Sequence, residues 1–464
     1  MTVLTAFTRR KSIEQLQQEA GESRQFRRVL GLWQLTAIGL GGIIGVGIFV
    51  LTGVVAATQA GPAVLIAFVL AGIASAAAAL CYAEFAGMIP VSGSAYTYGY
   101  AVLGEFAAWL LGWDLLLCYA LIVAVVAAGW SGYVQALLGA AGIQLPLWAQ
   151  GAAGSGAGHE FDVVACAVAL AVALLLTVRT EWGARFNTAI VAIKIAGVLL
   201  VILAGVAYVK PGNWHPFMPF GFHGVLAGAA VVFFAVFGYD TLTTAAEEAK
   251  DPQRDLPWAV VLSLGIAMIL YLGMCLVLTG IVPSSTLNNA APVANAFTAI
   301  GLRWVMLVVS AAAVTGITSV LFANMLAGAR IGFALSRDGL LPGWFSAVHP
   351  RFRTPHRATL TLGIVTAVAA GSLPLTVVAE VVNFGMLAAF AVICIAVVLL
   401  RRARPELPRS FRVPFVPLVP VIGTLFSLWL IWGLPLGVWL GFAIWMAVGA
   451  LFYLGYGMHH SRLR

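Results

Sequence analysis

The stretch that decides the fold is GLGGIIGVGIFVLTG, residues 39–53, in which six glycines interrupt an otherwise apolar run. Each glycine inside a helix costs about 1 kcal/mol relative to alanine, so this density weakens a helix in its middle. Two interpretations are open from the stretch alone. Gly41 and Gly45 form a GxxxG pair, which is typical of close helix packing in membranes. Alternatively, the chain is unwound from Gly41 to Gly47, where a ligand touches the backbone.

The composition places this stretch in a membrane protein. The chain has 464 residues and is 62% hydrophobic and 9% charged, whereas globular chains carry about 25% charged residues. A soluble fold of this size has no way to hide so much apolar surface, so we predict an all-α polytopic membrane protein. The five cysteines lie in apolar runs and form no CxxC pair, which predicts neither a metal site nor a disulfide framework.

Apolar segments long enough to cross a bilayer recur along the chain. We predict twelve spans, over 33–55, 61–88, 104–135, 159–178, 184–209, 224–247, 258–282, 301–335, 357–373, 376–400, 416–434 and 436–455. The first 28 residues are polar and contain no apolar leader, so we expect a cytoplasmic tail rather than a signal peptide.

The Lys and Arg residues orient these spans. When both chain ends are placed inside the cell, only Lys194, Lys210 and Arg303 of the 25 cations fall outside the inner loops and tails. This separation follows the positive-inside rule. The net charge of +8 therefore orients the chain in a plasma (inner) membrane and indicates no nucleic-acid partner.

A second interrupted helix lies five spans later. The segment FFAVFGYDTLTTAAEE, residues 233–248, breaks an apolar run with Gly238, Tyr239 and Asp240. Matched interruptions in two halves of a chain are typical of an inverted repeat with a substrate site between the halves. Half-helix N-termini attract anions and freed carbonyls attract cations, and an amino acid carries both groups. The pair of breaks favours a substrate site over simple packing.

Several motifs resemble the amino acid–polyamine–organocation permeases, above all the cationic amino acid transporter branch and its bacterial relatives. The likeness covers about residues 26–455 and rests on GLGGIIGVGIFVLTG, YAEFAGMIPVSGSAYTYGYAVLGE, GWSGYV, FFAVFGYDTLTTAAEEAKDPQRDLP, SRDGLLPGWFSAVHP and FRVPFVPLVPVIG. The resemblance implies a LeuT-like five-plus-five inverted-repeat core with two extra helices. The expected organisation is a tail over 1–28, a core over 29–401 (spans 1–5 over about 33–209, spans 6–10 over about 224–400), two helices over 402–457 and a tail over 458–464.

The resemblance also implies where a substrate binds. The residues expected to hold its carboxylate through backbone N–H groups are Gly45, Val46 and Gly47. The residues whose carbonyls are expected to hold its amino group are Ile43, Phe234, Ala235 and Phe237. Phe234 is further expected to cover the substrate as a lid. Val46 stands where the family usually has serine or threonine, so a hydroxyl is missing there.

Lys194 lies in the middle of the fifth span, in FNTAIVAIKIAGVLLVILAG. A buried ammonium is costly in a membrane, so such a residue is a candidate functional group. The resemblance implies that it reaches the first broken helix and replaces a sodium ion there. We therefore interpret Lys194 as a proton-coupling group or as a fixed charge holding the break, with snorkelling to an interface as the alternative.

Four further polar residues in or beside the spans are candidates. Asp114 lies one helical turn from Cys118, where the family branch often has glutamate, so Asp114 is either a displaced coupling carboxylate or a solvated group near the inner surface. Asn324 either faces the substrate side chain or forms an interhelical hydrogen bond. Glu84 and Asp240 are expected to belong to a gate or a structural polar network.

These observations favour a secondary amino acid transporter that is proton-coupled and sodium-independent and works by alternating access. Exchange, cationic amino acid uptake and, more remotely, sodium-coupled symport are the alternatives. We expect no enzyme activity, because no nucleophile motif or cofactor signature is present, and a channel or receptor fits paired broken helices less well. Apolar or small pocket positions favour neutral over cationic amino acids. The expected partners are an amino acid, a proton and the lipid bilayer, and the sequence leaves a small membrane subunit or a homo-oligomer open.

Overall fold

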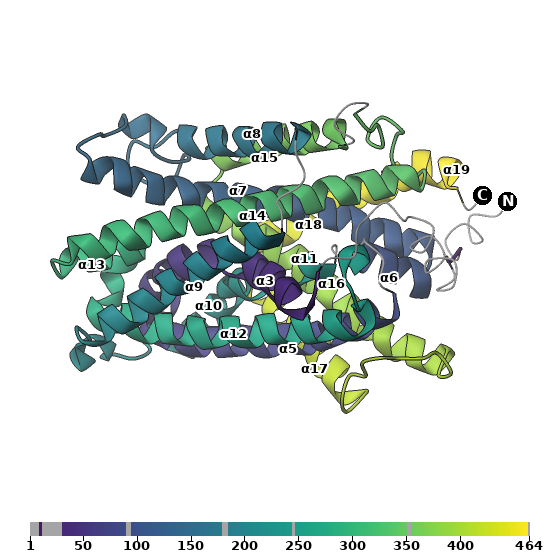
Figure 1. The fold of residues 1–464 in the computed structure, drawn as a ribbon, viewed down its shortest axis with the longest axis horizontal. Coiled ribbons are helices and arrows are strands. Elements are labelled where there is room, and N and C mark those ends of the chain that lie inside the picture. The colour runs from purple at the N-terminus through teal and green to yellow at the C-terminus, as the bar shows by residue number, and fades with distance from the viewer. Residues whose placement is uncertain are drawn as a thin grey trace.

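A computed structural model describes residues 9–11, 30–89, 94–178, 184–243, 246–349 and 354–462, except for the side chains of 184–187 and 247. Within these ranges the chain is a bundle of helices (Figure 1), apart from one isolated bridge between Leu30 and Ala249. Most of the predicted tail over 1–28, and the last two residues of the predicted tail over 458–464, lie outside the described residues.

The first of the helices up to residue 206 is a broken helix, interrupted after Ile43. They are α3 (Leu32–Ile43), a π- and α-helical run η1 (Gly47–Leu51), α4 (Thr52–Val55) and η2 (Ala56–Ala60), then α5 (Val64–Met88), α6 (Ser94–Val102), α7 (Glu105–Ala140), α8 (Val163–Val178) and α9 (Ala184–Val206). The first run ends at Gly61, whose φ is +63°. L side chains rarely adopt this backbone conformation, which explains why a glycine stands at this position. It therefore separates the first two predicted spans.

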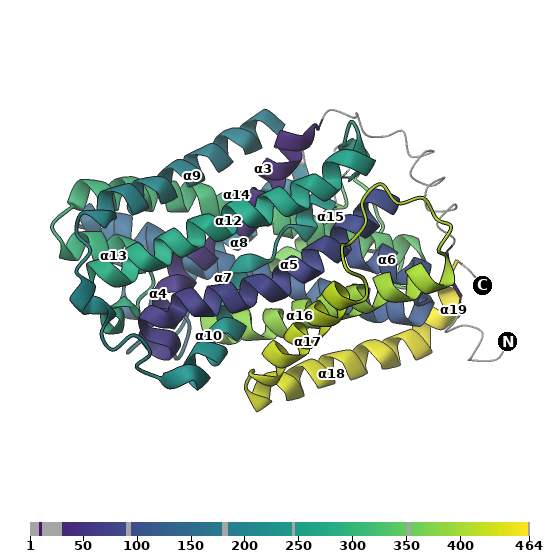
Figure 2. The ribbon, with the colours of Figure 1, turned by 90° about the horizontal axis from the view of Figure 1, so that it is seen from below.

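The second part of the chain also begins with a broken helix. The elements are α10 (Gly221–Val236), α11 (Asp240–Thr243), α12 (Pro252–Ile281), α13 (Pro292–Ala299), α14 (Arg303–Arg337), α15 (His356–Ser372), α16 (Leu375–Ala403), α17 (Leu418–Trp432), α18 (Leu436–Phe452), η8 (Tyr453–Gly457) and α19 (Met458–His460). The last pair, α17 and α18, lies along one edge of the bundle (Figure 2).

Every predicted span coincides with a helix or with a broken helix. Eight helical segments among the described residues are long and apolar enough to cross a membrane, and α3, α8 and α17 are shorter apolar helices. Large apolar side chains on the outside of the bundle, such as Leu203 (71% exposed) and Leu451 (69% exposed), suit contact with lipid rather than water. All five cysteines are free.

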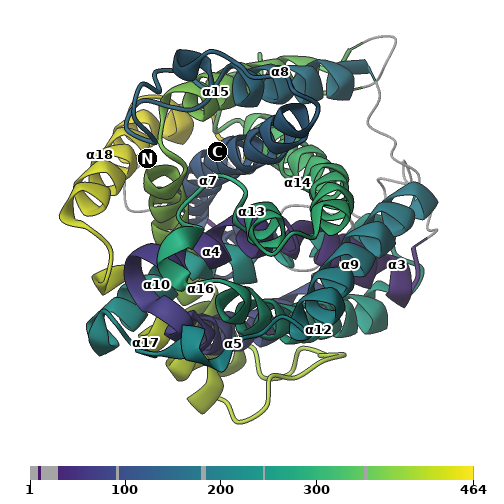
Figure 3. The ribbon, with the colours of Figure 1, turned by 90° about the vertical axis from the view of Figure 1, so that its left-hand side faces the viewer.

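Helices that are far apart in sequence pack in a regular scheme. The main contacts of α5, α7 and α8 are with α12, α14 and α15, and the pair α8 and α15 is visible at the edge of the end-on view (Figure 3). In terms of the predicted spans, the second, third and fourth each pack against the span five positions later. The first span likewise contacts the sixth, because η1 and η2 contact α10 and α11 contacts α3.

The described parts of the two chain ends meet at one end of the bundle, where α19 lies (Figure 1). The Glu105 N–H donates to the Arg9 carbonyl at 2.8 Å, and the Arg462 N–H donates to the Asp338 carbonyl at 3.1 Å. Lys11 forms an ion pair with Asp338 at 3.1 Å. Both ends therefore lie on the same side of the bundle.

Candidate functional site

The first helix break is shorter than the sequence predicts. The prediction that the chain is unwound from Gly41 to Gly47 is wrong in extent, because α3 stays helical through Ile43 and a π-helix begins at Gly47. Only Ile44 and Gly45 lie outside helical geometry between the two helical parts, because Val46 already has helical backbone angles. The segment around Gly238 packs tightly against Gly42, and this packing suits a helix in which Gly42 has no side chain.

The second break lies between α10 and α11. Helix α10 ends at Val236, and α11 begins at Asp240. Gly238 between them has a φ of +116°, a conformation that glycine adopts without steric cost. The hydroxyl of Thr241 donates to the Gly238 carbonyl at 2.6 Å, which satisfies one of the groups that the break leaves without a helical partner.

The two breaks touch each other along antiparallel chains. A Cβ atom on Gly42 would lie 2.6 Å from the Gly238 carbonyl oxygen, and a Cβ on Gly47 would collide with Ala235. As one chain advances from Gly42 to Gly47, the other therefore runs back from Gly238 to Ala235. Backbone approach this close requires glycine. The glycines in contact are Gly42 and Gly47, not the GxxxG pair Gly41 and Gly45, for which the packing interpretation stays a prediction.

Lys194 of α9 caps the first half of the broken helix. Its side chain is fully buried, and its Nζ donates to the carbonyls of Gly41 at 2.8 Å and Ile44 at 3.0 Å. The carbonyl end of a helix carries partial negative charge, so an ammonium is favoured there. The snorkelling interpretation is wrong, because Lys194 points into the bundle and packs against Gly316 of α14.

Tyr271 of α12 joins the two breaks and was not identified from the sequence. Its hydroxyl lies 2.8 Å from the Ile43 carbonyl oxygen and 2.8 Å from the Ala235 carbonyl oxygen. A phenol has one proton, so it donates to one carbonyl at a time and leaves the other to accept from a different donor. The only signal in the sequence was a single tyrosine in an apolar span.

The predicted substrate residues gather around these breaks, with one difference in direction. Phe234 is 6% exposed and stacks edge-on against Phe237 with ring centroids 5.3 Å apart. Val46 points toward Gly129 of α7, where its side chain fills the space that a Cβ on Gly129 would need. Val46 can therefore contribute backbone groups to the site, while its side chain packs between helices.

Asn324 lies on α14 next to the same region. Its Nδ2 donates to the Val320 carbonyl at 2.9 Å, one turn earlier on the same helix. Of the two alternatives for Asn324, the interhelical hydrogen bond is not formed by Nδ2, which bonds within its own helix; the substrate-facing alternative stays a prediction. Gly45 faces Val320 from the first break, since a Cβ on Gly45 would lie 3.1 Å from a Val320 methyl group.

Asp114 and Asp240 are both buried, with exposures of 2% and 1%. The interpretation of Asp114 as a solvated group is therefore wrong; its Oδ1 lies 3.4 Å from Cys118 Sγ. Asp240 accepts a hydrogen bond from the Tyr119 hydroxyl at 2.6 Å. Because α7 carries Asp114, Cys118 and Tyr119, this helix presents one carboxylate and contacts the other.

Glu84 belongs to an ionic network at the end of α5. It forms ion pairs with Arg401 and, at 3.1 Å, with Arg409, and it accepts the Val413 N–H at 2.8 Å. The network fastens the segment after α16 to α5. Its partners are distant in sequence, so sequence reasoning identified Glu84 as a network residue without its arginines.

The region brings backbone carbonyls and a few charged side chains together. It offers the carbonyls of two broken helices, the Lys194 ammonium and, beside the second break, the Asp240 carboxylate, within apolar surroundings. Among the described residues, no group of three or more His, Cys, Asp or Glu side chains is arranged to hold a metal ion. The arrangement suits a small polar molecule with an apolar part.

Comparisons with known proteins agree with this interpretation. The family model described as "Amino acid permease" matches residues 30–455. The chain is 47% identical to a methylthioribose transporter of Bacillus subtilis over 99% of this chain and 100% of that protein. It is 43% identical to the branched-chain amino acid permease BcaP of the same organism over 98% of each chain. It is also 35% identical to human cationic amino acid transporter 4, over 83% of this chain and 61% of that protein. The chain therefore belongs to the amino acid permease family, within the amino acid–polyamine–organocation superfamily.

Proposed function

We propose that this chain is a secondary active transporter of L-amino acids, coupled to protons and independent of sodium. The observation that carries the proposal is the contact between two broken antiparallel helices, with the Lys194 ammonium bound to the carbonyls of Gly41 and Ile44. Broken helices of this kind supply both charge types that an amino acid backbone needs.

The substrate is expected to lie against both breaks. Its carboxylate binds the N–H groups of Gly45, Val46 and Gly47, at the start of the second half of the broken helix. Its ammonium binds whichever carbonyl, of Ile43 or Ala235, the Tyr271 hydroxyl does not engage. Phe234 and Phe237 close the site, and Asn324 lies at the side-chain end.

Lys194 supports sodium independence. Sodium bound at the first break would need the carbonyl oxygens that the ammonium already occupies at 2.8 and 3.0 Å. When Lys194 loses its proton, its charge no longer holds the carbonyl end of α3, and the break is free to rearrange. Proton release from Lys194, with Asp114 as the second candidate group, thereby couples to substrate movement.

The packing scheme supports alternating access. The first four spans each pack against the span five positions later, as expected for two halves related by an inverted repeat. We propose twelve spans with both ends cytoplasmic in a plasma membrane, and rocking of one half against the other around the two breaks. Glu84 and Asp240 fix helices on either side of this movement.

The surroundings favour a neutral side chain. Phe234, Phe237 and Val320 are apolar and buried next to the breaks. Asp240, the acidic residue nearest in sequence, already accepts the Tyr119 hydroxyl. We therefore favour branched or other medium neutral amino acids, in agreement with the 43% identity to a branched-chain amino acid permease. Cationic amino acids and an exchange mode are the alternatives.

A second candidate substrate is methylthioribose. It is favoured by the 47% identity to a methylthioribose transporter over the whole length of both chains. Val46 also agrees with it, because a sugar has no carboxylate and does not need the hydroxyl that the family usually provides at this position. In this scheme the freed carbonyls would accept hydrogen bonds from ribose hydroxyls.

One screen separates these candidates. Purified protein is heated with each of the twenty amino acids, with methylthioribose and with unrelated solutes. A ligand present at about 100 times its Kd stabilises the folded state by about 2.7 kcal/mol. Leucine, isoleucine or valine should raise the melting temperature, and arginine should not. A shift with methylthioribose alone refutes the amino acid proposal, and uptake into proteoliposomes that requires sodium refutes sodium independence.

A further inference from the structure

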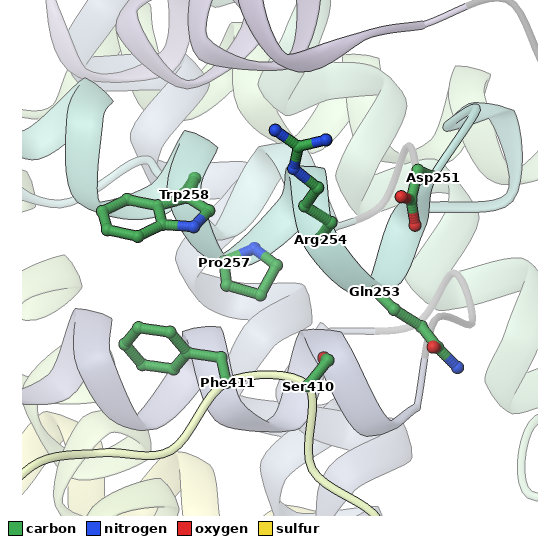
Figure 4. A pocket seen from close by; sticks show the side chains of 7 residues that line it. All are labelled: Asp251, Gln253, Arg254, Pro257, Trp258, Ser410 and Phe411. Carbon is green, nitrogen blue, oxygen red and sulfur yellow. The ribbon is translucent and has the colours of Figure 1, made fainter.

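A cavity of about 250 Å³ lies away from the helix breaks, between the start of α12 and the segment that joins α16 to α17. Its lining residues are Asp251, Gln253, Arg254, Pro257, Trp258, Ser410 and Phe411. The rings of Trp258 and Phe411 lie on one side, with the side chains of Arg254 and Asp251 on the other (Figure 4). One cavity thus combines an acid, a base and an aromatic wall.

The wall formed by the joining segment is held in place. Glu84 pairs with Arg409 at 3.1 Å and accepts the Val413 N–H at 2.8 Å, on either side of Ser410 and Phe411. The α5 backbone supports the cavity from behind, because a Cβ on Gly87 would collide with Ser410. The cavity is therefore a fixed part of the fold, built from three elements.

The two opposite charges in the cavity do not neutralise each other. Asp251 is the N-cap of α12, and Arg254 lies three residues later in its first turn. Among the described residues, neither side chain takes part in an ion pair, and Asp251 makes no capping hydrogen bond. A ligand with one negative and one positive group at a similar separation would satisfy both.

The cavity lies where a membrane surface is expected. Helix α12 is one of the segments apolar enough to cross a membrane, and the cavity is at its first turns. Trp258 is 52% exposed, as is typical of aromatic residues at the level of lipid headgroups. Residues 401–412 contain five arginines and one glutamate. Arg401 and Arg409 pair with Glu84, and the other three arginines add positive charge that attracts phosphate groups.

We propose that this cavity binds the headgroup of a membrane phospholipid that carries a primary amine. The phosphate faces Arg254, and the ammonium donates hydrogen bonds to Asp251. Ser410 and Gln253 donate to phosphate or glycerol oxygens, while the acyl chains extend past Trp258 and Phe411. A quaternary amine cannot donate hydrogen bonds to Asp251, and a headgroup without an amine leaves that carboxylate unpaired. The site does not depend on what the protein transports.

Lipid retention by purified protein tests this assignment. The full chain is exchanged into detergent with equal amounts of phosphatidylethanolamine, phosphatidylcholine and phosphatidylglycerol, and bound lipids are counted by native mass spectrometry. We expect phosphatidylethanolamine to be retained about two- to fivefold over phosphatidylcholine, the size that exposed ion pairs give. Asp251→Asn should bring this ratio close to one, and Arg254→Gln should lower retention of all three lipids.

The matched control is Arg303→Gln. Arg303 is also an exposed arginine beside an exposed tryptophan, Trp304 (58% exposed), at the start of a long apolar helix, but it does not line the cavity. It should leave the lipid ratios unchanged. Equal retention of phosphatidylethanolamine and phosphatidylcholine by the wild-type chain, or an Asp251→Asn variant that keeps the wild-type ratio, would overturn the assignment. Preferred retention of phosphatidylglycerol would overturn it as well.

Discussion

The substitution Gly238→Ala should damage the contact between the two helix breaks more than any other single methyl addition near the site. Gly238 has a φ of +116°, so an alanine there is strained; such strain costs about 1–3 kcal/mol. Its Cβ would also lie 2.7 Å from the carbonyl carbon of Gly42, and backbone on both sides leaves no flexible atom to move. Overpacking of this kind costs a further 1–3 kcal/mol or so.

A second glycine separates the two costs. Gly301 also has a positive φ, +82°, but a Cβ there would meet nothing within 4 Å. Gly301→Ala should therefore show the strain alone, and Gly238→Ala should be about 1–3 kcal/mol less stable than this control. Gly265 in α12 has open space and no positive φ, so Gly265→Ala should be neutral or stabilising.

The assay is thermal unfolding of the three variants in detergent, followed by uptake in proteoliposomes. We expect the melting temperature to fall in the order Gly265→Ala, Gly301→Ala, Gly238→Ala, and uptake to be lost only in the last. A Gly238→Ala variant as stable as Gly301→Ala would show that the two breaks do not pack in the way described. The close-approach argument would then be refuted.

Three further substitutions test the remaining contacts. Lys194→Met removes the ammonium from the carbonyls of Gly41 and Ile44 and should abolish the pH dependence of uptake. The control Lys210→Met should keep it, and an unchanged pH profile in Lys194→Met would exclude Lys194 from coupling. Tyr271→Phe leaves the Ile43 and Ala235 carbonyls without the hydroxyl donor, at a cost of about 1–3 kcal/mol; it should weaken the thermal shift given by substrate, and a wild-type shift would contradict its bridging role. Glu84→Gln leaves Arg401 and Arg409 without their counter-charge and should destabilise the protein by about 3 kcal/mol in thermal unfolding. The exposed control Glu406→Gln should leave the melting temperature unchanged, and equal melting temperatures for both variants would count against the network.

The positions of the helices could be predicted because hydropathy is a local property. A run of about 20 apolar residues specifies a membrane helix whatever surrounds it, and the twelve predicted ranges coincide with helices or broken helices. The two breaks were likewise visible as glycine and polar residues within apolar runs. Their extent was not, because Gly41 and Gly42 remain helical, and the opposite chain packs against Gly42.

The sequence by itself therefore determined the class of protein, the helix ranges, the two breaks and the ammonium in the fifth span. Lys194 was also expected to reach the first broken helix, and it does so at the carbonyls of Gly41 and Ile44. Only the tertiary structure decided that Tyr271 lies between the two breaks and that Val46 is turned toward Gly129. The physical reason is that hydropathy and glycine content act within a few residues. The direction of a side chain, by contrast, depends on the space left by helices that are far away in sequence.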